Sequence, residues 1–155
     1  MIELKDVSFT YESGETKNSL KHIDLTIHDG ETILFCGESG CGKTTLTRLI
    51  NGLIPHYYTG KLDGKVLLNG KELKDYPLYQ IGQRVSSVFQ NPRTQFYNVD
   101  TTSEIMFGCE NMGLPVPVMT RRLEDTTKSL KLEKLLNRSL FTLSGGEKQK
   151  IACAS

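Results

Sequence analysis

Residues 37–44 carry the clearest chemical pattern in the sequence, because they read Gly-Glu-Ser-Gly-Cys-Gly-Lys-Thr and satisfy the P-loop pattern G-x-x-x-x-G-K-[ST] in full. Its glycines allow the backbone to wrap closely around phosphate oxygens and to point successive N–H groups toward them. Lys43 supplies a positive charge for the β- and γ-phosphates, and the Thr44 hydroxyl can ligate Mg²⁺. The residues expected to hold a nucleoside triphosphate are Gly37, Glu38, Ser39, Gly40, Cys41, Gly42, Lys43, Thr44 and Thr45.

A second glycine-rich segment, residues 143–147, reads Leu-Ser-Gly-Gly-Glu, and its Ser144 lies 101 residues after Lys43. Locally it predicts a capping box, with Ser144 as the N-cap of a helix and Glu147 reaching back to the Ser144 N–H. Two consecutive glycines in the first turn cost about 1 kcal/mol each relative to alanine. That cost is understandable if a phosphate has to approach the helix N-terminus closely.

The residues around the first motif predict the elements that would position it. Thr32–Cys36 is a short, almost fully apolar run, typical of a strand buried on both faces of a parallel sheet. After the loop, apolar residues recur at i, i+3, i+4 and i+7 from Leu46 to Leu53, which predicts one apolar helix face. Gly52 is placed to end this helix.

The remaining patterns predict a mixture of strands and helices. Strands are predicted at Glu3–Tyr11, Ile23–Ile27, Lys65–Leu68 and Arg84–Phe89, and a tight Asn69-Gly70 hairpin follows the third of them. The polar stretch Glu12–Asn18 predicts a turn. Helices are predicted between Thr94 and Leu136, with an interruption at Gly113–Pro117.

Length and charge bound the class of protein. The 155 residues are enough for one domain with one buried core. The 19 basic and 18 acidic residues give a net charge of +1, which offers no bulk field for nucleic acid, and no nucleic-acid partner is expected. No run of 18 apolar residues is present, and the N-terminus lacks the features of a signal peptide. These features predict a cytosolic compartment.

The two glycine-rich motifs resemble the Walker A and signature sequences of ABC ATPases, and the likeness extends over essentially the whole chain. The resemblance implies an α/β fold of the P-loop NTPase type, with an incomplete parallel core sheet, an antiparallel β section and a helical subdomain. It divides the chain into a nucleotide-binding core at 1–93, a helical subdomain at 94–143, and the signature motif with the start of its helix at 144–155. The C-terminal part of the domain would lie beyond this sequence.

The same resemblance implies roles for two further residues. Phe9-Thr10-Tyr11 is similar to the aromatic A-loop, which implies that Tyr11 stacks on the adenine of ATP. Residues 88–92, Val-Phe-Gln-Asn-Pro, are similar to the Q-loop, which implies that Gln90 contacts Mg²⁺ and the attacking water and, with Lys43, takes part in catalysis. The alternative for Tyr11 is an ordinary aromatic residue of a strand, and the alternative for Gln90 is a surface glutamine at the end of a strand.

The resemblance also implies partners. ATP and Mg²⁺ would bind at a head-to-tail dimer, in which the P-loop of one subunit faces Ser144, Gly145 and Gly146 of the other. The second ATP-binding subunit would be identical or a sister chain, and the pair would drive integral membrane subunits of an importer from the cytoplasmic face of the membrane. Residues 89–92, 95–96 and 107–115 resemble the energy-coupling-factor importers of vitamins and metals. Residues 51–58 resemble members in which two ATPase domains are fused, which would make this chain the N-terminal half of a longer protein.

An ABC ATPase also needs two acidic residues at the end of an apolar strand after the signature helix, and this sequence contains no such strand. We therefore expect the 155 residues alone to be soluble, to bind nucleotide weakly and to hydrolyse it hardly at all. Because the strands that flank Thr32–Cys36 in such folds come from further along the chain, we also expect its apolar surface to be exposed. The alternatives are a nucleotide-binding or interaction module without turnover, and a soluble ABC-type ATPase such as a translation factor.

Overall fold

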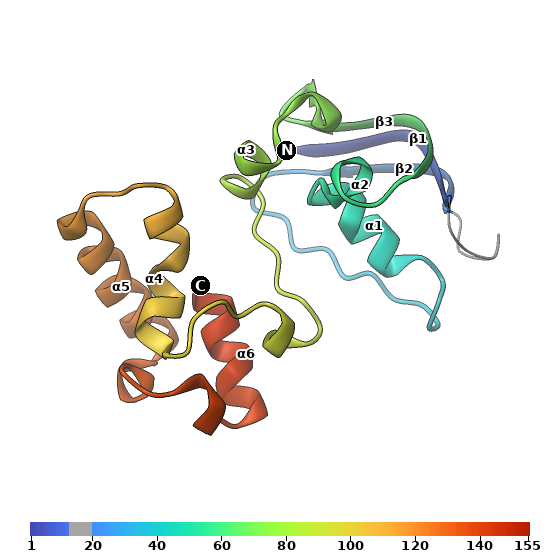
Figure 1. Cartoon of the computed structure of the whole chain (residues 1–155). Coiled ribbons are helices and arrows are strands. Elements are labelled where there is room, and N and C mark those ends of the chain that lie inside the picture. The colour runs from blue at the N-terminus through green and yellow to red at the C-terminus, as the bar shows by residue number, and fades with distance from the viewer. Residues whose placement is uncertain (13–19) are drawn as a thin grey trace. The chain divides into compact units, whose positions relative to one another are not determined.

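A computed structural model describes residues 1–12 and 20–155, which form two compact units, Met1–Ser87 and Val88–Ser155 (Figure 1). The first unit consists of β1 (Ile2–Tyr11), β2 (Leu20–Ile27), α1 (Lys43–Ile50), α2 (Leu53–His56), β3 (Gly60–Leu68), β4 (Lys71–Glu72), a 3-10 turn at Leu73–Asp75 and α3 (Leu78–Gly82). The turn expected at Glu12–Asn18 falls, apart from Glu12, outside the described residues.

The sheet of the first unit has the strand order β2-β1-β3-β4, and every neighbouring pair is antiparallel. Ile2 at the start of β1 lies opposite Ile27 on one side and Leu68 on the other. The predicted hairpin after β3 is confirmed, since Asn69 (φ 51°) and Gly70 (φ 81°) both adopt the left-handed conformation that a type I′ turn requires.

The core of the first unit lies between one face of this sheet and the helices that follow it (Figure 1). The helix predicted after the P-loop is confirmed as α1, and it buries Leu49 completely. The buried residues of this core are Leu4, Val7, Phe9, Leu20, Leu49, Ile54, Val66, Leu68, Leu73 and Ile81. α1 is therefore fixed to the sheet along one face, as its apolar spacing predicted.

The strands predicted at Thr32–Cys36 and Arg84–Phe89 are not formed, and both predictions are wrong for this structure. A strand is stable only when its backbone N–H and C=O groups pair with a neighbour. None of the described strands pairs with either segment. The expectation of exposed apolar surface is met, since Leu34 is 83% and Ile33 is 38% exposed.

The second unit is helical. Its elements are a 3-10 turn at Pro92–Thr94, α4 (Thr101–Asn111), α5 (Val116–Leu130), 3-10 turns at Glu133–Leu135 and Leu140–Thr142, and α6 (Gly145–Ala154). The predicted helical region and its interruption near Gly113–Pro117 are confirmed. The buried apolar residues of its core are Ile105, Leu132, Leu135, Leu140, Leu143 and Ile151.

A buried carboxylate orders the entry to α4. Glu104 is only 2% exposed, and its Oε2 accepts hydrogen bonds from the backbone N–H groups of Tyr97 (3.0 Å) and Asn98 (2.8 Å). The Asn98 side-chain amide adds a third hydrogen bond at 3.3 Å. The loop before the helix is thus held by a group whose burial would be costly without these partners.

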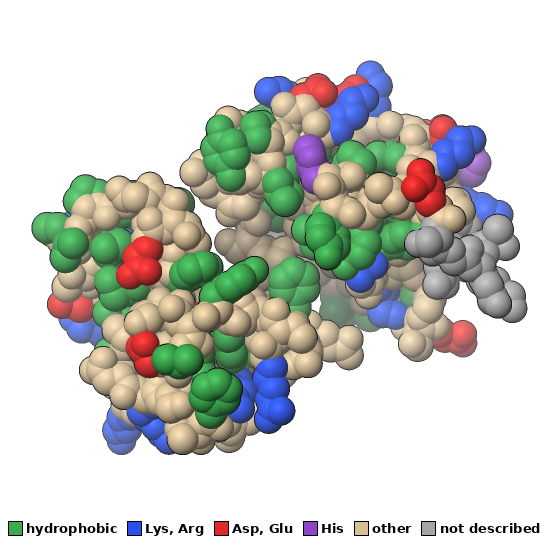
Figure 2. All heavy atoms as spheres, viewed as in Figure 1, with side chains coloured by type: hydrophobic (Ala, Val, Ile, Leu, Met, Phe, Trp, Pro, Cys, Tyr) green, Lys and Arg blue, Asp and Glu red, His purple; other side chains and the backbone are tan. Residues whose placement is uncertain are grey.

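Large hydrophobic side chains are exposed on both units (Figure 2), among them Leu34, Tyr57 and Tyr79 in the first and Tyr97 and Phe141 in the second. Within residues 1–12 and 20–155, no helix combines the length and the apolar character needed to cross a membrane.

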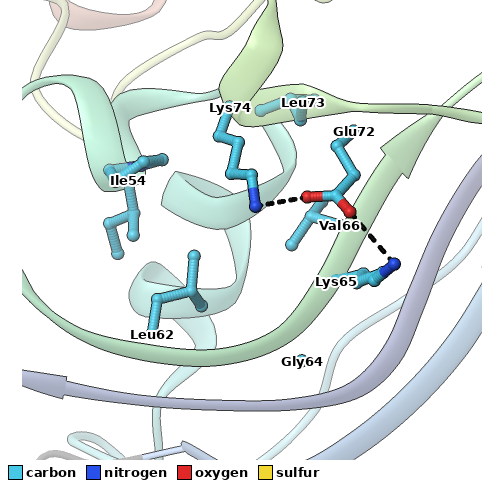
Figure 3. A pocket seen from close by; sticks show the side chains of 9 residues that line it. Ile54, Leu62, Gly64, Lys65, Val66, Glu72, Leu73 and Lys74 are labelled. Atoms are coloured by element: carbon cyan, nitrogen blue, oxygen red, sulfur yellow. Dashed lines mark ion pairs between the residues drawn. The ribbon is translucent and has the colours of Figure 1, made fainter.

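A small cavity of about 20 Å³ lies beside the β3–β4 hairpin (Figure 3). The Glu72 carboxylate at its edge pairs with Lys74 (2.6 Å) and Lys65 (3.2 Å), and the hydrogen bond from Lys74 keeps the pKa of this carboxyl below its ordinary value. The cavity is about the size of one water molecule and too small for a nucleotide. Its wall includes Gly64, which has φ 83° and lies where the register of β1 against β3 shifts.

We predict that Gly64→Ala destabilises the first unit by about 2 kcal/mol or more, because a methyl group here would collide with the carbonyl oxygen of Asp6 in β1. Gly70→Ala is the matched control: its φ is 81° and no atom lies within 4 Å of an added methyl group, so it should cost only about 1 kcal/mol. Urea unfolding followed by tyrosine fluorescence measures both. Equal losses in the two variants would contradict the collision.

Candidate functional site

The predicted phosphate loop leads directly into α1, whose N-cap is Gly42 with φ 100°. A methyl group on Gly42 would lie 2.6 Å from Cδ2 of Leu20, a buried residue of β2. Both the backbone conformation and this contact therefore require glycine. An added methyl group on Gly40 would meet nothing within 4 Å, so the loop is open at this residue.

No side chain in the described part of the chain caps the N-terminus of α1. The first N–H groups of a helix have no partner within the helix, and the helix dipole makes this end positive. α1 therefore presents backbone donors and a partial positive charge beside an open loop, which is the arrangement that binds phosphate.

Lys43 lies across this loop. Its Nζ donates hydrogen bonds to the carbonyl oxygens of Gly37 (2.8 Å) and Glu38 (2.7 Å), and it lies 3.5 Å from Sγ of Cys41. The Cys41 N–H donates to the Glu38 carbonyl at 3.3 Å, which closes the turn. The ammonium group is thus held at the loop, where phosphate oxygens can replace its carbonyl acceptors.

The next two residues face in different directions. Thr44 is exposed at the first turn of α1, which leaves its hydroxyl accessible to a metal ion. Thr45 is buried, and its Oγ1 accepts a hydrogen bond from the Tyr11 hydroxyl at 3.3 Å. Tyr11 ends β1, so the expected adenine-stacking residue is joined directly to the helix that begins at the phosphate loop.

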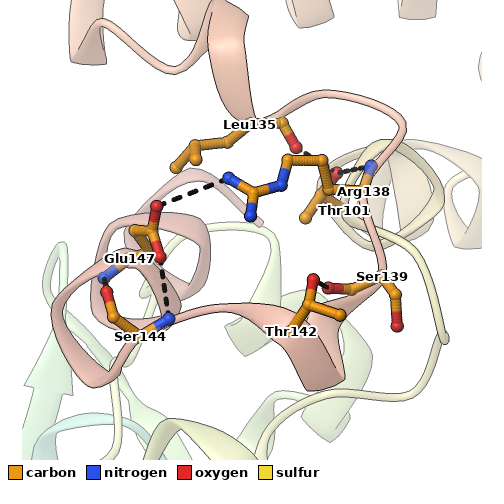
Figure 4. A network of polar contacts seen from close by, with 7 residues as sticks. All are labelled: Thr101, Leu135, Arg138, Ser139, Thr142, Ser144 and Glu147. Atoms are coloured by element: carbon orange, nitrogen blue, oxygen red, sulfur yellow. Dashed lines mark hydrogen bonds and ion pairs between the residues drawn. The ribbon is translucent and has the colours of Figure 1, made fainter.

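The predicted capping box at the start of α6 is confirmed (Figure 4). The Ser144 Oγ accepts a hydrogen bond from the Glu147 N–H at 3.3 Å, and Glu147 Oε2 accepts one from the Ser144 N–H at 2.7 Å. Arg138 approaches the same carboxylate at 3.5 Å. Added methyl groups on Gly145 and Gly146 would meet nothing within 4 Å, so an anion can approach this helix end closely.

Gln90 lies exposed in an irregular segment of the second unit, two residues before a 3-10 turn that is capped by the Asn91 side chain. Gln95, to which the sequence assigned no role, holds this segment: its Oε1 accepts from the Phe89 N–H (3.2 Å) and its Nε2 donates to the Ala152 carbonyl of α6 (3.2 Å). The predicted site residues thus form two groups, with Tyr11 and residues 37–45 in the first unit, and Gln90 and residues 144–146 in the second.

Comparisons with known proteins identify the family. The family model described as ABC transporter matches residues 20–155. An ABC transporter ATP-binding protein of Treponema denticola is 54% identical over the whole chain, which spans 32% of that relative. The chain thus spans about a third of the length of this relative, and 31% of a second Treponema protein that is 47% identical.

Two solved structures are similar over 99% of the chain, each at 26% identity. CbiO1 of Clostridium perfringens, described as part of the ABC transporter complex CbiONQ, has a TM-score of 0.83, and the chain covers 59% of it. A dimeric bacterial ABC transporter cassette has a TM-score of 0.81, and the chain covers 68% of it. The α/β fold is that of the P-loop ATPase cassette.

The hydrogen bonds of the capping box predict how the start of α6 responds to pH through Glu147. The hydrogen bonds from the Ser144 N–H and then the Ser144 hydroxyl lower the pKa of this carboxyl, and Arg138 adds a smaller effect in the same direction. A carboxyl group whose pKa is lower in the folded state than in the unfolded chain stabilises the folded state at pH values above its pKa in the unfolded chain. That stabilisation is lost as the pH falls through the lowered pKa of the folded state. The N-terminus of α6 should therefore loosen only below the ordinary glutamate range.

We predict that an NMR titration of the Glu147 carboxyl carbon has its midpoint below the ordinary glutamate value. Ser144→Ala removes the hydroxyl but keeps the N–H, so the midpoint should rise partway. Ser139→Ala is the control, since the Ser139 hydroxyl accepts a hydrogen bond from the Phe141 N–H and makes no polar contact with Glu147 among the described residues, and it should leave the midpoint unchanged. An unchanged midpoint in Ser144→Ala would exclude this origin.

Proposed function

The chain belongs to the ABC transporter family of ATP-binding proteins, and from this premise we propose that residues 37–45 bind the triphosphate of ATP together with Mg²⁺. The observation that carries the proposal is the convergence of three features at one place: the uncapped N-terminus of α1, the open loop before it, and the Lys43 ammonium group. All three favour an anion with several negative charges.

In this proposal the loop residues divide the work between them. The N–H groups of residues 37–43 bind phosphate oxygens, and Lys43 exchanges its bonds to Gly37 and Glu38 for bonds to the β- and γ-phosphates. Thr44 would provide an oxygen ligand for Mg²⁺, and so would Gln90 by its likeness to the Q-loop; the metal ion would neutralise charge on the phosphates. Tyr11 holds the adenine end. Gln90 additionally orients the attacking water in the intact ATPase.

We further propose that Ser144, Gly145 and Gly146 bind the ATP held by a second ATP-binding subunit or domain, arranged head to tail. Support comes from the open N-terminus of α6 and from the dimeric state of one similar cassette. The parts of the domain would be the nucleotide-binding core (1–93), the helical subdomain (94–143) and the signature segment (144–155). ATP binding would close the pair, and hydrolysis would open it.

We also propose that the parent protein is an importer of the energy-coupling-factor type, acting on integral membrane subunits at the cytoplasmic face of the membrane. The likeness to a subunit of the CbiONQ complex supports it. The chain spans 59% of CbiO1 but 32% of the Treponema relative, so that relative is almost twice as long as CbiO1. This length supports a parent protein in which two cassettes are joined in tandem.

We predict that Lys43→Ala raises the dissociation constant for Mg-ATP about tenfold or more in the intact protein, because it removes the charge that pairs with the phosphates. Lys61→Ala is the matched control: it removes the same charge from the first unit, at a side chain that is 81% exposed and pairs only with Asp63 at 3.4 Å among the described residues. Isothermal titration calorimetry measures both. Equal affinities in wild type and Lys43→Ala would refute the proposed site.

A further inference from the structure

Tyr11 is held by α1 through its hydroxyl group. This oxygen donates to Thr45 Oγ1 at 3.3 Å and accepts a hydrogen bond from Nη1 of Arg48 at 3.0 Å. Thr45 and Arg48 are three residues apart on α1 and therefore lie on the same side of the helix. The last residue of β1 is thus attached at two points to the helix that follows the phosphate loop, one near its start and one in its last turn.

The Arg48 guanidinium group also contacts a third segment, the loop before β3. Its Cζ lies 3.9 Å from the centroid of the Tyr58 ring, a close cation–π contact, and 6.0 Å from that of Tyr11. The Tyr58 and Tyr11 rings are perpendicular, with centroids 6.2 Å apart, and Phe9 packs edge-to-face on Tyr11 at 4.8 Å. Tyr11, Arg48 and Tyr58 are all partly buried, so these contacts are partly shielded from water.

These contacts constrain one distance that matters for a nucleotide. In the proposed complex the phosphates would lie at the N-terminus of α1, while the base would lie against Tyr11. Because Thr45 and Arg48 attach Tyr11 to α1, they set the separation between the two ends of the ligand. A ring that is already held in place loses less conformational freedom on binding than one that must be ordered by the ligand.

We propose that Arg48 is a positioning residue for the nucleotide base: it fixes Tyr11 relative to the phosphate loop by bonding to the Tyr11 hydroxyl while its guanidinium group is held against Tyr58. This inference rests on the proposed binding of ATP and adds to it a residue that touches neither the phosphates nor Mg²⁺. The effect of Arg48 on binding is therefore confined to ligands that carry a base.

The test compares Mg-ATP with Mg-tripolyphosphate, which has the phosphates but no base, by calorimetry on the intact protein. Arg48→Met should weaken Mg-ATP about fivefold and leave Mg-tripolyphosphate within about twofold. Tyr58→Leu, which leaves α1 untouched, should produce the same base-dependent loss. Arg84→Met is the matched control, since Arg84 also lies over a tyrosine ring (Tyr76, 5.4 Å) and bonds a backbone carbonyl, and it should change neither affinity.

The outcomes separate the two proposals. Equal weakening of both ligands by Arg48→Met and Tyr58→Leu would mean that the residues only stabilise the first unit, and it would overturn the positioning role. No weakening of either ligand would overturn it as well. Failure of Mg-tripolyphosphate to bind wild type, or its unchanged binding to Lys43→Ala, would instead overturn the phosphate site and with it the inference.

Discussion

The position of one helix end determines the part of the candidate site that lies in the first unit. α1 buries Leu49 and Thr45 against the first unit, and its N-cap, Gly42, packs on Leu20 of β2 with no room for a side chain. This contact fixes where the helix begins. Lys43 then reaches back over the loop, Thr44 faces outward and Thr45 meets Tyr11. Packing on one face of a short helix thus sets the direction of three neighbouring side chains.

The two helix ends with glycine-rich sequences are built differently. α1 begins without a side-chain cap in the described residues, so its N-terminal donors are available to a ligand. α6 begins with a capping box, in which Ser144 and Glu147 satisfy each other and Arg138 pairs with the carboxylate. The start of α6 is therefore stabilised by its own side chains, and no atom lies within 4 Å of a methyl group added to Gly145 or Gly146. The uncapped N-terminus of α1 suits a site that binds an anion itself. The capped N-terminus of α6 suits a preformed surface that contacts an anion bound elsewhere.

The sequence predicted local features well and distant pairings poorly. The Asn69-Gly70 hairpin, α1 and the capping box at Ser144 depend on residues within a few positions of each other, and all three are present. The strands expected at Thr32–Cys36 and Arg84–Phe89 depend on partner strands, which an apolar run cannot reveal, and neither formed. The contacts of Arg48 with Tyr11 and Tyr58 were missed for the same reason, because they join segments that only the fold brings together. The buried Glu104 was also missed, although it bonds the nearby residues Tyr97 and Asn98, because no sequence pattern marked its carboxylate as buried. The i, i+3 spacing of Thr45 and Arg48 on the predicted helix was the single local feature of the sequence that pointed to the Arg48 contacts.

The central claim is that the loop at the N-terminus of α1 holds the triphosphate and its metal ion. The most direct test replaces Mg²⁺ by paramagnetic Mn²⁺ and follows the amide resonances of the isotopically labelled protein as ATP is added. The claim predicts that broadening is strongest at Lys43, Thr44 and Thr45, and that it is lost in Lys43→Ala. Strongest broadening away from these residues and Gln90 would contradict it, for example at Asp29, whose carboxylate accepts a hydrogen bond from the N-terminal ammonium group.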